Sequence, residues 1–259
     1  MPGIDGSLCV FCGSRANSDE HVLAKSVCEC AGDINYPVIA GLSVEGQENT
    51  IRNVRPMPIQ ALKVNCVCKT CNETWMSKLE VWFVSRLGDL IKPQWPQNSS
   101  ALIDALKPES NKLAHWLLKT AVTFNHSTLK GDHPVEFSST ITRKIKDGIL
   151  PENCWIDFAF SKTTTFAAGI TRHFFIKNGA QNIQSFPLKS GDGFHFVVQL
   201  NHLLLRIAQA PHVKESVYPN QNGELPIRLY PTPSPQTPDN FAYEDMMNFQ
   251  QSIVLRTWA

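Results

Sequence analysis

The sequence lacks the features that mark membrane-spanning, secreted and repeat proteins. It has no run of 18 apolar residues and no basic segment followed by an apolar stretch near its start, so we expect neither a membrane span nor a secretory signal. We find no internal repeat, no phosphate-cradling glycine loop and no nucleophile motif. Neither positive nor negative charge is in clear excess, because the chain has 24 Lys and Arg and 23 Asp and Glu. Net charge therefore gives no reason to expect a nucleic-acid partner, and any function must follow from local chemistry.

The composition is that of a folded globular protein. Of the 259 residues, 42% are hydrophobic and 18% are charged, which excludes disorder, collagen and coiled coil as the main architecture. The length fits one large domain or two small ones. Without a secretory signal we expect the protein in the reducing cytoplasm, where cysteine thiols bind metal more often than they form disulfides.

The spacing of the cysteines predicts a zinc site. Two C-x-x-C pairs, Cys9 with Cys12 and Cys68 with Cys71, can supply four thiolates to a tetrahedral zinc. The 55 residues between the pairs are far more than a simple zinc ribbon has, so a sizeable element must lie between them. The remaining cysteines are expected to be spare or packing residues: Cys28, Cys30, Cys66 and Cys154.

Polar residues that suit phosphodiester hydrolysis lie next to both cysteine pairs. Glu20-His21 follows the first pair, and Asn72 directly follows the second. An acidic-His dipeptide after one zinc knuckle and an asparagine after the other resemble the HNH endonucleases. More narrowly, EHVLAKSV and VCKTCNETWMSKLE are similar to a group of bacterial HNH-type proteins. The segment LAHWLLKTAV, residues 113–122, is similar to a further stretch of that group.

The resemblance implies a ββα-metal core and a role for each polar residue. His21 would be the general base, since the unperturbed pKa of histidine lies near ~6.5. Glu20 and Asn72 would bind a catalytic Mg²⁺ or Mn²⁺ through oxygen, which such ions prefer, and the zinc would be structural.

The sequence departs from the family pattern at one position that leaves alternatives open. The family has an asparagine about five residues before the third cysteine, where this chain has Lys63, and Asn65 stands three before it. One alternative is therefore a catalytically inactive, zinc-stabilised module that binds nucleic acid or protein. Another is an RNase on the same scaffold, because hydrolysis by a metal ion and a histidine does not distinguish ribose from deoxyribose.

The pattern along the chain predicts an α+β fold in three parts. We expect an HNH core with zinc knuckles in residues 1–95, a helical extension in 96–150, and a mainly antiparallel sheet region of unknown role in 151–259. The stretch 81–150 has nine basic and six acidic residues, and this excess of positive charge makes it the part of the chain better suited to bind nucleic acid. The candidate phosphate-binding residues are Lys119, Arg143, Lys144 and Lys146.

Together these features predict a metal-dependent HNH-type endonuclease. Double-stranded DNA is the expected substrate, and phage or mobile-element defence is a consistent role. We see no helix-turn-helix or finger array, so we expect weak sequence preference, or recruitment by a protein partner. A homodimer is a further possibility for the sheet region, and no membrane partner is expected.

Overall fold

The computed structural model describes most of the chain, and all structural statements below concern these residues. They are 7–32, 35–37, 56–96, 99–127, 137–171, 173–178, 182–187, 193–209, 214–217, 227–230, 242–243 and 253–256. The fold mixes helices and sheets, as the sequence predicts. No helix within the described part of the chain has both the length and the apolar character needed to cross a bilayer.

The first part of the chain forms a small β-ladder followed by a long helix. Its elements are β1 (Ser18–His21), α1 (Lys25–Ala31), β2 (Asn35–Pro37), β3 (Pro56–Pro58), η1 (Ile59–Ala61), β4 (Lys63–Val67), α2 (Lys69–Cys71), η2 (Asn72–Met76) and α3 (Ser77–Leu87). Strand β1 pairs with β4 in antiparallel fashion, and β2 pairs with β3. Segments α2, η2 and α3 follow one another without a break, and η2 is a single π-helical turn.

The middle part is helical. It comprises α4 (Ser99–Leu106), η3 (Lys107–Glu109), α5 (Ser110–Asn125) and α6 (Ser139–Lys146). Helix α6 begins where Ser138 Oγ accepts a hydrogen bond from the backbone N–H of Ile141 (3.2 Å), which is a serine N-cap. It is followed by Gly148 at φ +75°, a left-handed conformation that glycine adopts without strain.

The last part forms two sheets. The first contains β5 (Cys154–Thr171), β8 (Phe194–Gln209), β10 (Ile227–Tyr230) and β11 (Ala242–Tyr243), and the second contains β6 (His173–Asn178), β7 (Asn182–Pro187), β9 (Lys214–Val217) and β12 (Ile253–Arg256). The pairing is mainly antiparallel, as expected, with β5 and β8 paired along most of their length. The pairs β11–β5 and β12–β6 are parallel.

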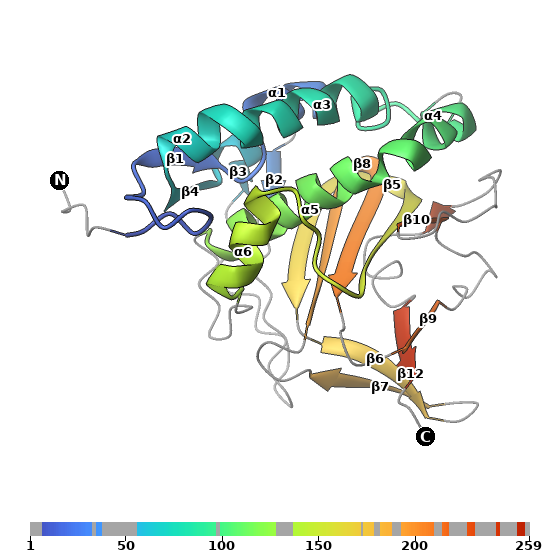
Figure 1. Cartoon of the computed structure of the whole chain (residues 1–259). Coiled ribbons are helices and arrows are strands. Elements are labelled where there is room, and N and C mark those ends of the chain that lie inside the picture. The colour runs from blue at the N-terminus through green and yellow to red at the C-terminus, as the bar shows by residue number, and fades with distance from the viewer. Residues whose placement is uncertain are drawn as a thin grey trace.

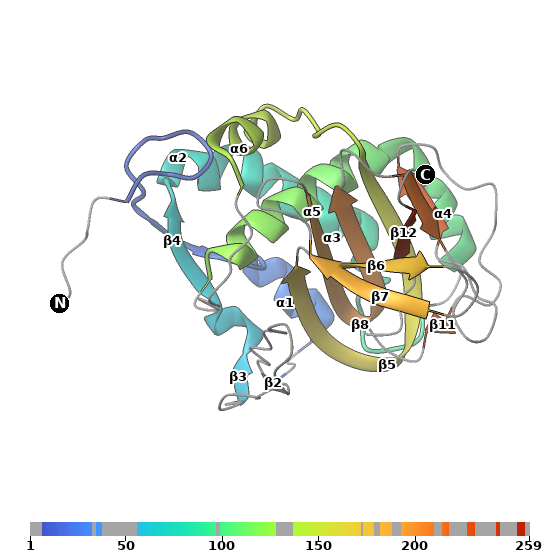
Figure 2. The ribbon, with the colours of Figure 1, turned by 90° about the horizontal axis from the view of Figure 1, so that it is seen from below.

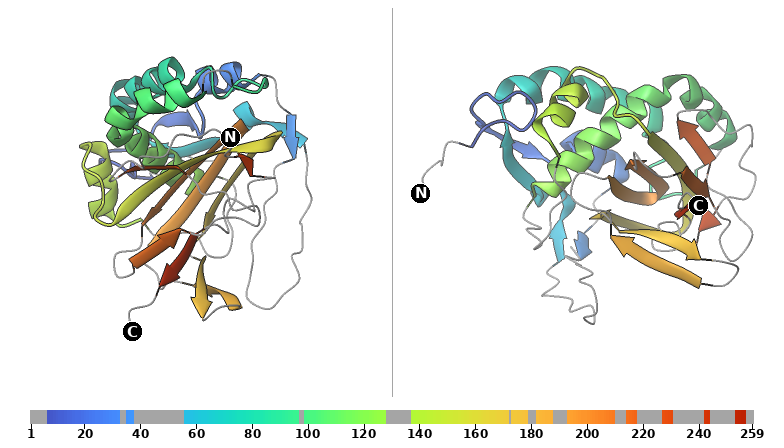
Figure 3. Two further views of the ribbon diagram at one scale, coloured as in Figure 1. Left: turned by 90° about the vertical axis from the view of Figure 1, so that its right-hand side faces the viewer. Right: turned by 60° about the horizontal axis from the view of Figure 1, so that its bottom comes forward.

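These parts are stacked in layers. Figure 1 shows α1 and α3 on the outside, α5 beneath them and the β5–β8 sheet below α5. Figure 2, seen from below, places β6 and β7 in front of β5 and β8. Figure 3 shows the helices gathered on one side and the second sheet on the other, so the β5–β8 sheet lies between the two.

A single hydrophobic cluster joins the three segments predicted from the sequence. It contains Phe11 from the first segment, Trp116 from the helical segment and Phe158 from the sheet. The rings of Phe83 and Trp116 stack with their centroids 3.7 Å apart, so α3 packs closely against α5. Among the described residues, the boundaries at 95 and 150 therefore do not separate independent cores.

Asn201 ties the first segment to the sheet. Its side-chain amide donates hydrogen bonds to the backbone oxygens of Ala31, at the end of α1, and Ile91, after α3, at 2.8 and 2.7 Å. Asn201 itself has φ +53°, a conformation that asparagine tolerates better than most residues. A position in the middle of β8 thus satisfies two carbonyls that the helical segments leave at their ends.

Candidate metal centre

Four cysteines come together at one end of the molecule. The sulfur atoms of Cys9, Cys12, Cys68 and Cys71 all lie within 4.8 Å of one another, and the Sγ atoms of Cys12 and Cys68 are 3.5 Å apart. Tetrahedral zinc with Zn–S bonds of about 2.3 Å needs sulfurs about 3.8 Å apart. The four predicted ligands therefore form a group that can hold a metal ion such as zinc, with little rearrangement.

Local backbone geometry shapes each half of this group. In the first knuckle, the N–H of Gly13 donates to the oxygen of Cys9 (2.8 Å), and Gly13 has φ +75°. In the second, Cys68 caps α2, because its Sγ accepts the N–H of Cys71 at 3.4 Å. The N–H of Val10 donates to the oxygen of Cys66 (2.9 Å), which joins the two knuckles directly.

The thiols of the group differ in acidity. Burial raises the pKa of Cys9 and of Cys71 above that of a free thiol. Burial acts in the same direction on Cys12, but hydrogen bonds from Ser14 and the neighbouring sulfurs outweigh it and lower the pKa of Cys12 to about 6. A divalent cation would stabilise all four as thiolates, which is how zinc binds cysteine.

The other cysteines stay outside this group. Cys28, Cys66 and Cys154 are thiols whose pKa burial raises to about 12, as expected of packing residues. Within the described ranges, no second set of three or more His, Cys, Asp or Glu side chains is close enough to hold a metal ion. Among these residues there is therefore no such cluster of ligands at Glu20 and Asn72, where a metal ion bound through oxygen is predicted.

Asn72 is joined to the strand that carries Glu20 and His21. Its side-chain Nδ2 donates to Ser18 Oγ at 2.7 Å. This hydrogen bond uses the amide nitrogen rather than Oδ1, the atom that a hard cation would need. Asn72 is also the first residue of the π-helical turn, where its carbonyl accepts the N–H of Ser77. Single π-helical turns occur often at functional sites.

Glu20 is buried and part of a charge cluster. Its side chain points into the protein with 5% exposure, and its Oε1 lies 3.7 Å from Lys119 Nζ of α5. Lys119 also donates a short hydrogen bond to Glu80 Oε1 of α3, and Trp116 Nε1 donates to Glu80 Oε2 at 2.9 Å. We call Glu20, Glu80, Lys119 and Trp116 the buried charge cluster.

The cluster shifts the acidity of its members. Burial raises the pKa of Glu20, and Glu80 adds to this, while Lys119 acts in the opposite direction. For Lys119, burial disfavours the ammonium, but the charges of Glu80 and Glu20 outweigh it and raise its pKa. Lys119 is therefore a charged lysine in the interior.

The role predicted for Lys119 is wrong. We expected it on a solvent-facing edge of the helix, in contact with phosphate, but its side chain is 0% exposed. Helix α5 is covered by α3 on one side and by β5 and β8 on the other, so nearly all of its residues face protein. Lys119 belongs to the core, and its partners are carboxylates.

His21 is at the end of β1, opposite Lys63 on β4. Its side chain is half-buried. Burial lowers the pKa of His21, and the positive charge of Lys63 lowers it further, although Asp19 opposes both. The imidazole is therefore neutral near pH 7, the state that a general base needs. Lys63, the residue that departs from the family pattern, here acts on the histidine through its charge.

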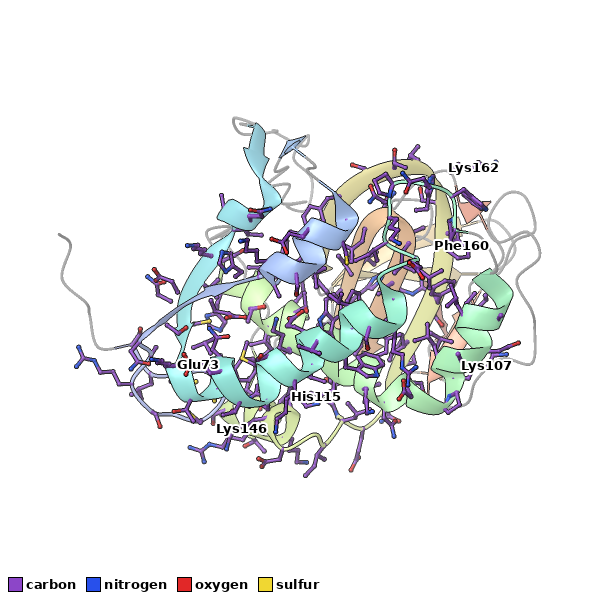
Figure 4. All side chains as sticks on the ribbon, turned by 90° about the horizontal axis from the view of Figure 1, so that it is seen from above. Glu73, Lys107, His115, Lys146, Phe160 and Lys162 are labelled. Carbon is purple, nitrogen blue, oxygen red and sulfur yellow. The ribbon has the colours of Figure 1, made fainter. Side chains whose placement is uncertain are left out.

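The other three predicted phosphate-binding residues lie on α6 and are exposed: Arg143, Lys144 and Lys146. Helix α6 is fixed to the first knuckle, because Thr142 Oγ1 donates to the oxygen of Val10 at 2.6 Å. A Cβ atom on Gly13 would lie 3.8 Å from Arg143 Nη2, so this side chain sits beside the knuckle turn. Figure 4 shows Lys146 at the same end of the molecule as Glu73 and His115.

Two members of the buried charge cluster, Glu80 and Trp116, were not singled out from the sequence. A signal for Glu80 exists, since it falls on the apolar stripe of its helix, four residues after Met76 and three before Phe83. A charged residue on a buried stripe needs a partner of opposite charge. Sequence alone does not say which basic residue supplies it.

Comparisons of this chain with models of protein families, with curated proteins and with solved structures found no match.

Proposed function

We propose that this chain is a metal-dependent phosphodiester hydrolase of the HNH type that acts on double-stranded DNA. The observation that carries the proposal is the hydrogen bond between Asn72 and Ser18. It fixes the start of the long helix beside β1, on which Ser18 and Glu20 are only two residues apart. This hydrogen bond joins two residues that are 54 positions apart in the sequence, and it lies between the strand of Glu20 and His21 and the helix that follows the second cysteine pair.

The proposed reaction divides the chemistry among three side chains. His21, neutral near pH 7, would take the proton of the attacking water. Glu20 and Asn72 would hold a Mg²⁺ or Mn²⁺ ion through their oxygens, and such an ion stabilises charge on the phosphate and on the leaving oxygen. The cysteine-bound zinc would have no part in the chemistry and would keep the helix and strand together.

The proposed path of the DNA runs across α6. Arg143, Lys144 and Lys146 are exposed on one short helix that is hydrogen-bonded to the first knuckle. Contacts of this kind bind the phosphate backbone and carry no sequence information. We therefore propose weak sequence preference, which suits a nuclease of phage or mobile-element defence.

A second candidate function is a zinc-stabilised binding module without catalysis. The observation in its favour is the burial of Glu20 beside Lys119, since an ammonium 3.7 Å from the carboxylate competes with a metal ion. On this alternative the exposed face of α6 would still bind nucleic acid, and His21 would be without a catalytic role.

A cleavage assay separates the two candidates. Purified protein is incubated with supercoiled plasmid or single-stranded RNA in Mg²⁺, Mn²⁺ or EDTA. We expect metal-dependent nicking of the plasmid and a loss of ~10²-fold or more in His21→Ala. The matched control is His126→Ala, which removes an exposed histidine that follows α5 and lies outside the site. Binding to DNA without cleavage, in a folded and zinc-loaded protein, would favour the binding module, and cleavage of RNA alone would change the substrate.

A further inference from the structure

A zinc ion bound by the four cysteines would place a charged group in a largely buried environment. Four thiolates outweigh the charge of one Zn²⁺, so the group as a whole is negative. Cys9, Cys68 and Cys71 are each no more than 5% exposed. Burying such charge is costly unless hydrogen-bond donors surround the sulfur atoms. The donors around each thiolate therefore affect how tightly the metal ion is bound.

Three of the four sulfur atoms have donors from the knuckles themselves. Cys68 Sγ accepts the backbone N–H of Cys71 at 3.4 Å. Burial raises the pKa of Cys9, but hydrogen bonds from the backbone of the knuckles oppose this effect. For Cys12, burial is outweighed by hydrogen bonds, of which those from Ser14 lower the pKa most. The fourth sulfur, that of Cys71, has its main donor outside the knuckles.

The side chain of Trp75 is this donor. Trp75 follows Cys71 by one turn of the continuous helix, so the two side chains lie on the same side of it. Burial raises the pKa of Cys71, and the largest opposing effect comes from the side chain of Trp75. Its indole N–H is a donor and cannot accept. The Nε1 atom is buried and makes no regular hydrogen bond with nitrogen or oxygen in the described part of the chain.

Aromatic contacts fix the orientation of the Trp75 ring. Phe11, which lies between the first two cysteines, meets the indole at 84° with the ring centroids 5.0 Å apart. His115 of α5 stacks on the indole, with 3° between the planes and 5.1 Å between the centroids. Burial lowers the pKa of His115, so this ring is neutral near pH 7 and adds no positive charge. Contacts with the first knuckle and with α5 therefore hold the indole in place beside the second knuckle.

We propose that the indole N–H of Trp75 donates a hydrogen bond to the thiolate of Cys71 in the zinc-loaded protein and thereby strengthens zinc binding. A thiol is a weak acceptor, whereas hydrogen bonds to ionised groups are roughly twice as strong as those between neutral groups. A buried donor without an acceptor costs stability, and a zinc-bound thiolate supplies a strong acceptor to this one. The inference concerns the metal centre and goes beyond the proposed function, since it applies to an enzyme and to a binding module alike.

The test compares the full-length wild type with two variants that lack the N–H. One is Trp75→Phe, and the other has 3-benzothienylalanine at position 75, whose ring keeps the size and shape of indole but has sulfur in place of N–H. Competition with a chelator measures the affinity for zinc, and we expect both variants to bind it ~10-fold or more weakly. In the Co²⁺-loaded proteins, the sulfur-to-cobalt charge-transfer band should move to longer wavelength, because a thiolate without this hydrogen bond gives up an electron more readily.

The matched control is Trp82→Phe, the same change seven residues later on the continuous helix. The indole N–H of Trp82 donates to Glu109 Oε2 at 3.0 Å, so its loss should leave the zinc affinity and the band position unchanged. If Trp75→Phe does not fold, the benzothienyl variant decides, because it keeps the ring packing and removes only the donor.

Two outcomes overturn the inference. A benzothienyl variant with the zinc affinity and band position of the wild type would make Trp75 a packing residue, even if Trp75→Phe binds zinc weakly. A folded wild type that binds neither Zn²⁺ nor Co²⁺ would refute the metal centre itself, and this inference with it. Weaker zinc binding and a shifted band in the benzothienyl variant would support the hydrogen bond, whether or not the protein cleaves DNA.

Discussion

Replacing Cys68 with serine tests the metal centre most directly. Cys68 has two roles, since its sulfur is 3.5 Å from that of Cys12 and also accepts the N–H of Cys71 as the cap of α2. Serine is itself a good N-cap, so Cys68→Ser preserves the cap and removes the thiolate. The variant therefore isolates the contribution of this side chain as a metal ligand.

The expected loss is large compared with the stability of the protein. Structural zinc contributes ~10–16 kcal/mol of apparent binding free energy at pH 7 in small zinc domains. If one of four ligands carries about a quarter of this, Cys68→Ser costs ~2.5–4 kcal/mol. A domain has only about 5–15 kcal/mol of net stability, so the unfolding midpoint in denaturant should fall markedly. Because Cys68 and Cys71 belong to the shared hydrophobic cluster, the loss should extend beyond the knuckles.

The assay combines zinc content by mass spectrometry with denaturant unfolding. The matched control is Cys66→Ser, which makes the same chemical change two residues earlier, at a cysteine outside the four-sulfur group. We expect about one zinc per chain in the wild type and in Cys66→Ser, and much less in Cys68→Ser. A Cys68→Ser protein with full zinc content and an unchanged midpoint would refute the metal centre.

Three further predictions concern the joints of the fold. Asn201→Ala leaves two buried carbonyls without donors and should cost ~2–6 kcal/mol in denaturant unfolding, whereas Asn201→Gly relieves the positive φ and should cost less. Asp157→Asn removes one partner of the fully buried Arg206 ion pair and should cost ~3–5 kcal/mol, with an unchanged melting temperature as the contrary result. Burial lowers the pKa of His195 to about 3, and Arg206 adds to this, so the unfolded chain takes up a proton first as the pH falls below ~6.5. Stability should then fall by up to ~1.4 kcal/mol per unit between about pH 6.5 and 3, and a fall just as steep in His195→Gln would count against this.

The parts of the structure that sequence reasoning found are those with local signals. The 16-residue helix α5, from Ser110 to Asn125, lies within the helical extension predicted for residues 96–150. The four cysteines could be identified because the C-x-x-C spacing is itself the geometry of a knuckle. Pairing of the two knuckles needed no knowledge of the 55 residues between them.

The parts that escaped prediction depend on contacts between distant segments. Lys119 was expected at the surface because its helix has an apolar face and polar residues elsewhere, which is the usual pattern of a half-exposed helix. In the fold, both sides of α5 are covered, and the lysine finds Glu80, 39 residues earlier in the chain. The register between β1 and β4 escaped prediction for the same reason, because His21 pairs with Lys63 across a long intervening segment.

The difference between an enzyme and a binding module comes down to the environment of one carboxylate. Lys119 donates its hydrogen bond to Glu80, which Trp116 also contacts, and the same ammonium forms an ion pair with Glu20 at 3.7 Å. The ion pair with Lys119 offsets part of the cost of burying Glu20, while the cluster as a whole holds two carboxylates and one ammonium. A divalent cation at Glu20 would have to displace this ammonium, so the enzyme and the binding module differ in whether Glu20 leaves Lys119 when metal is added.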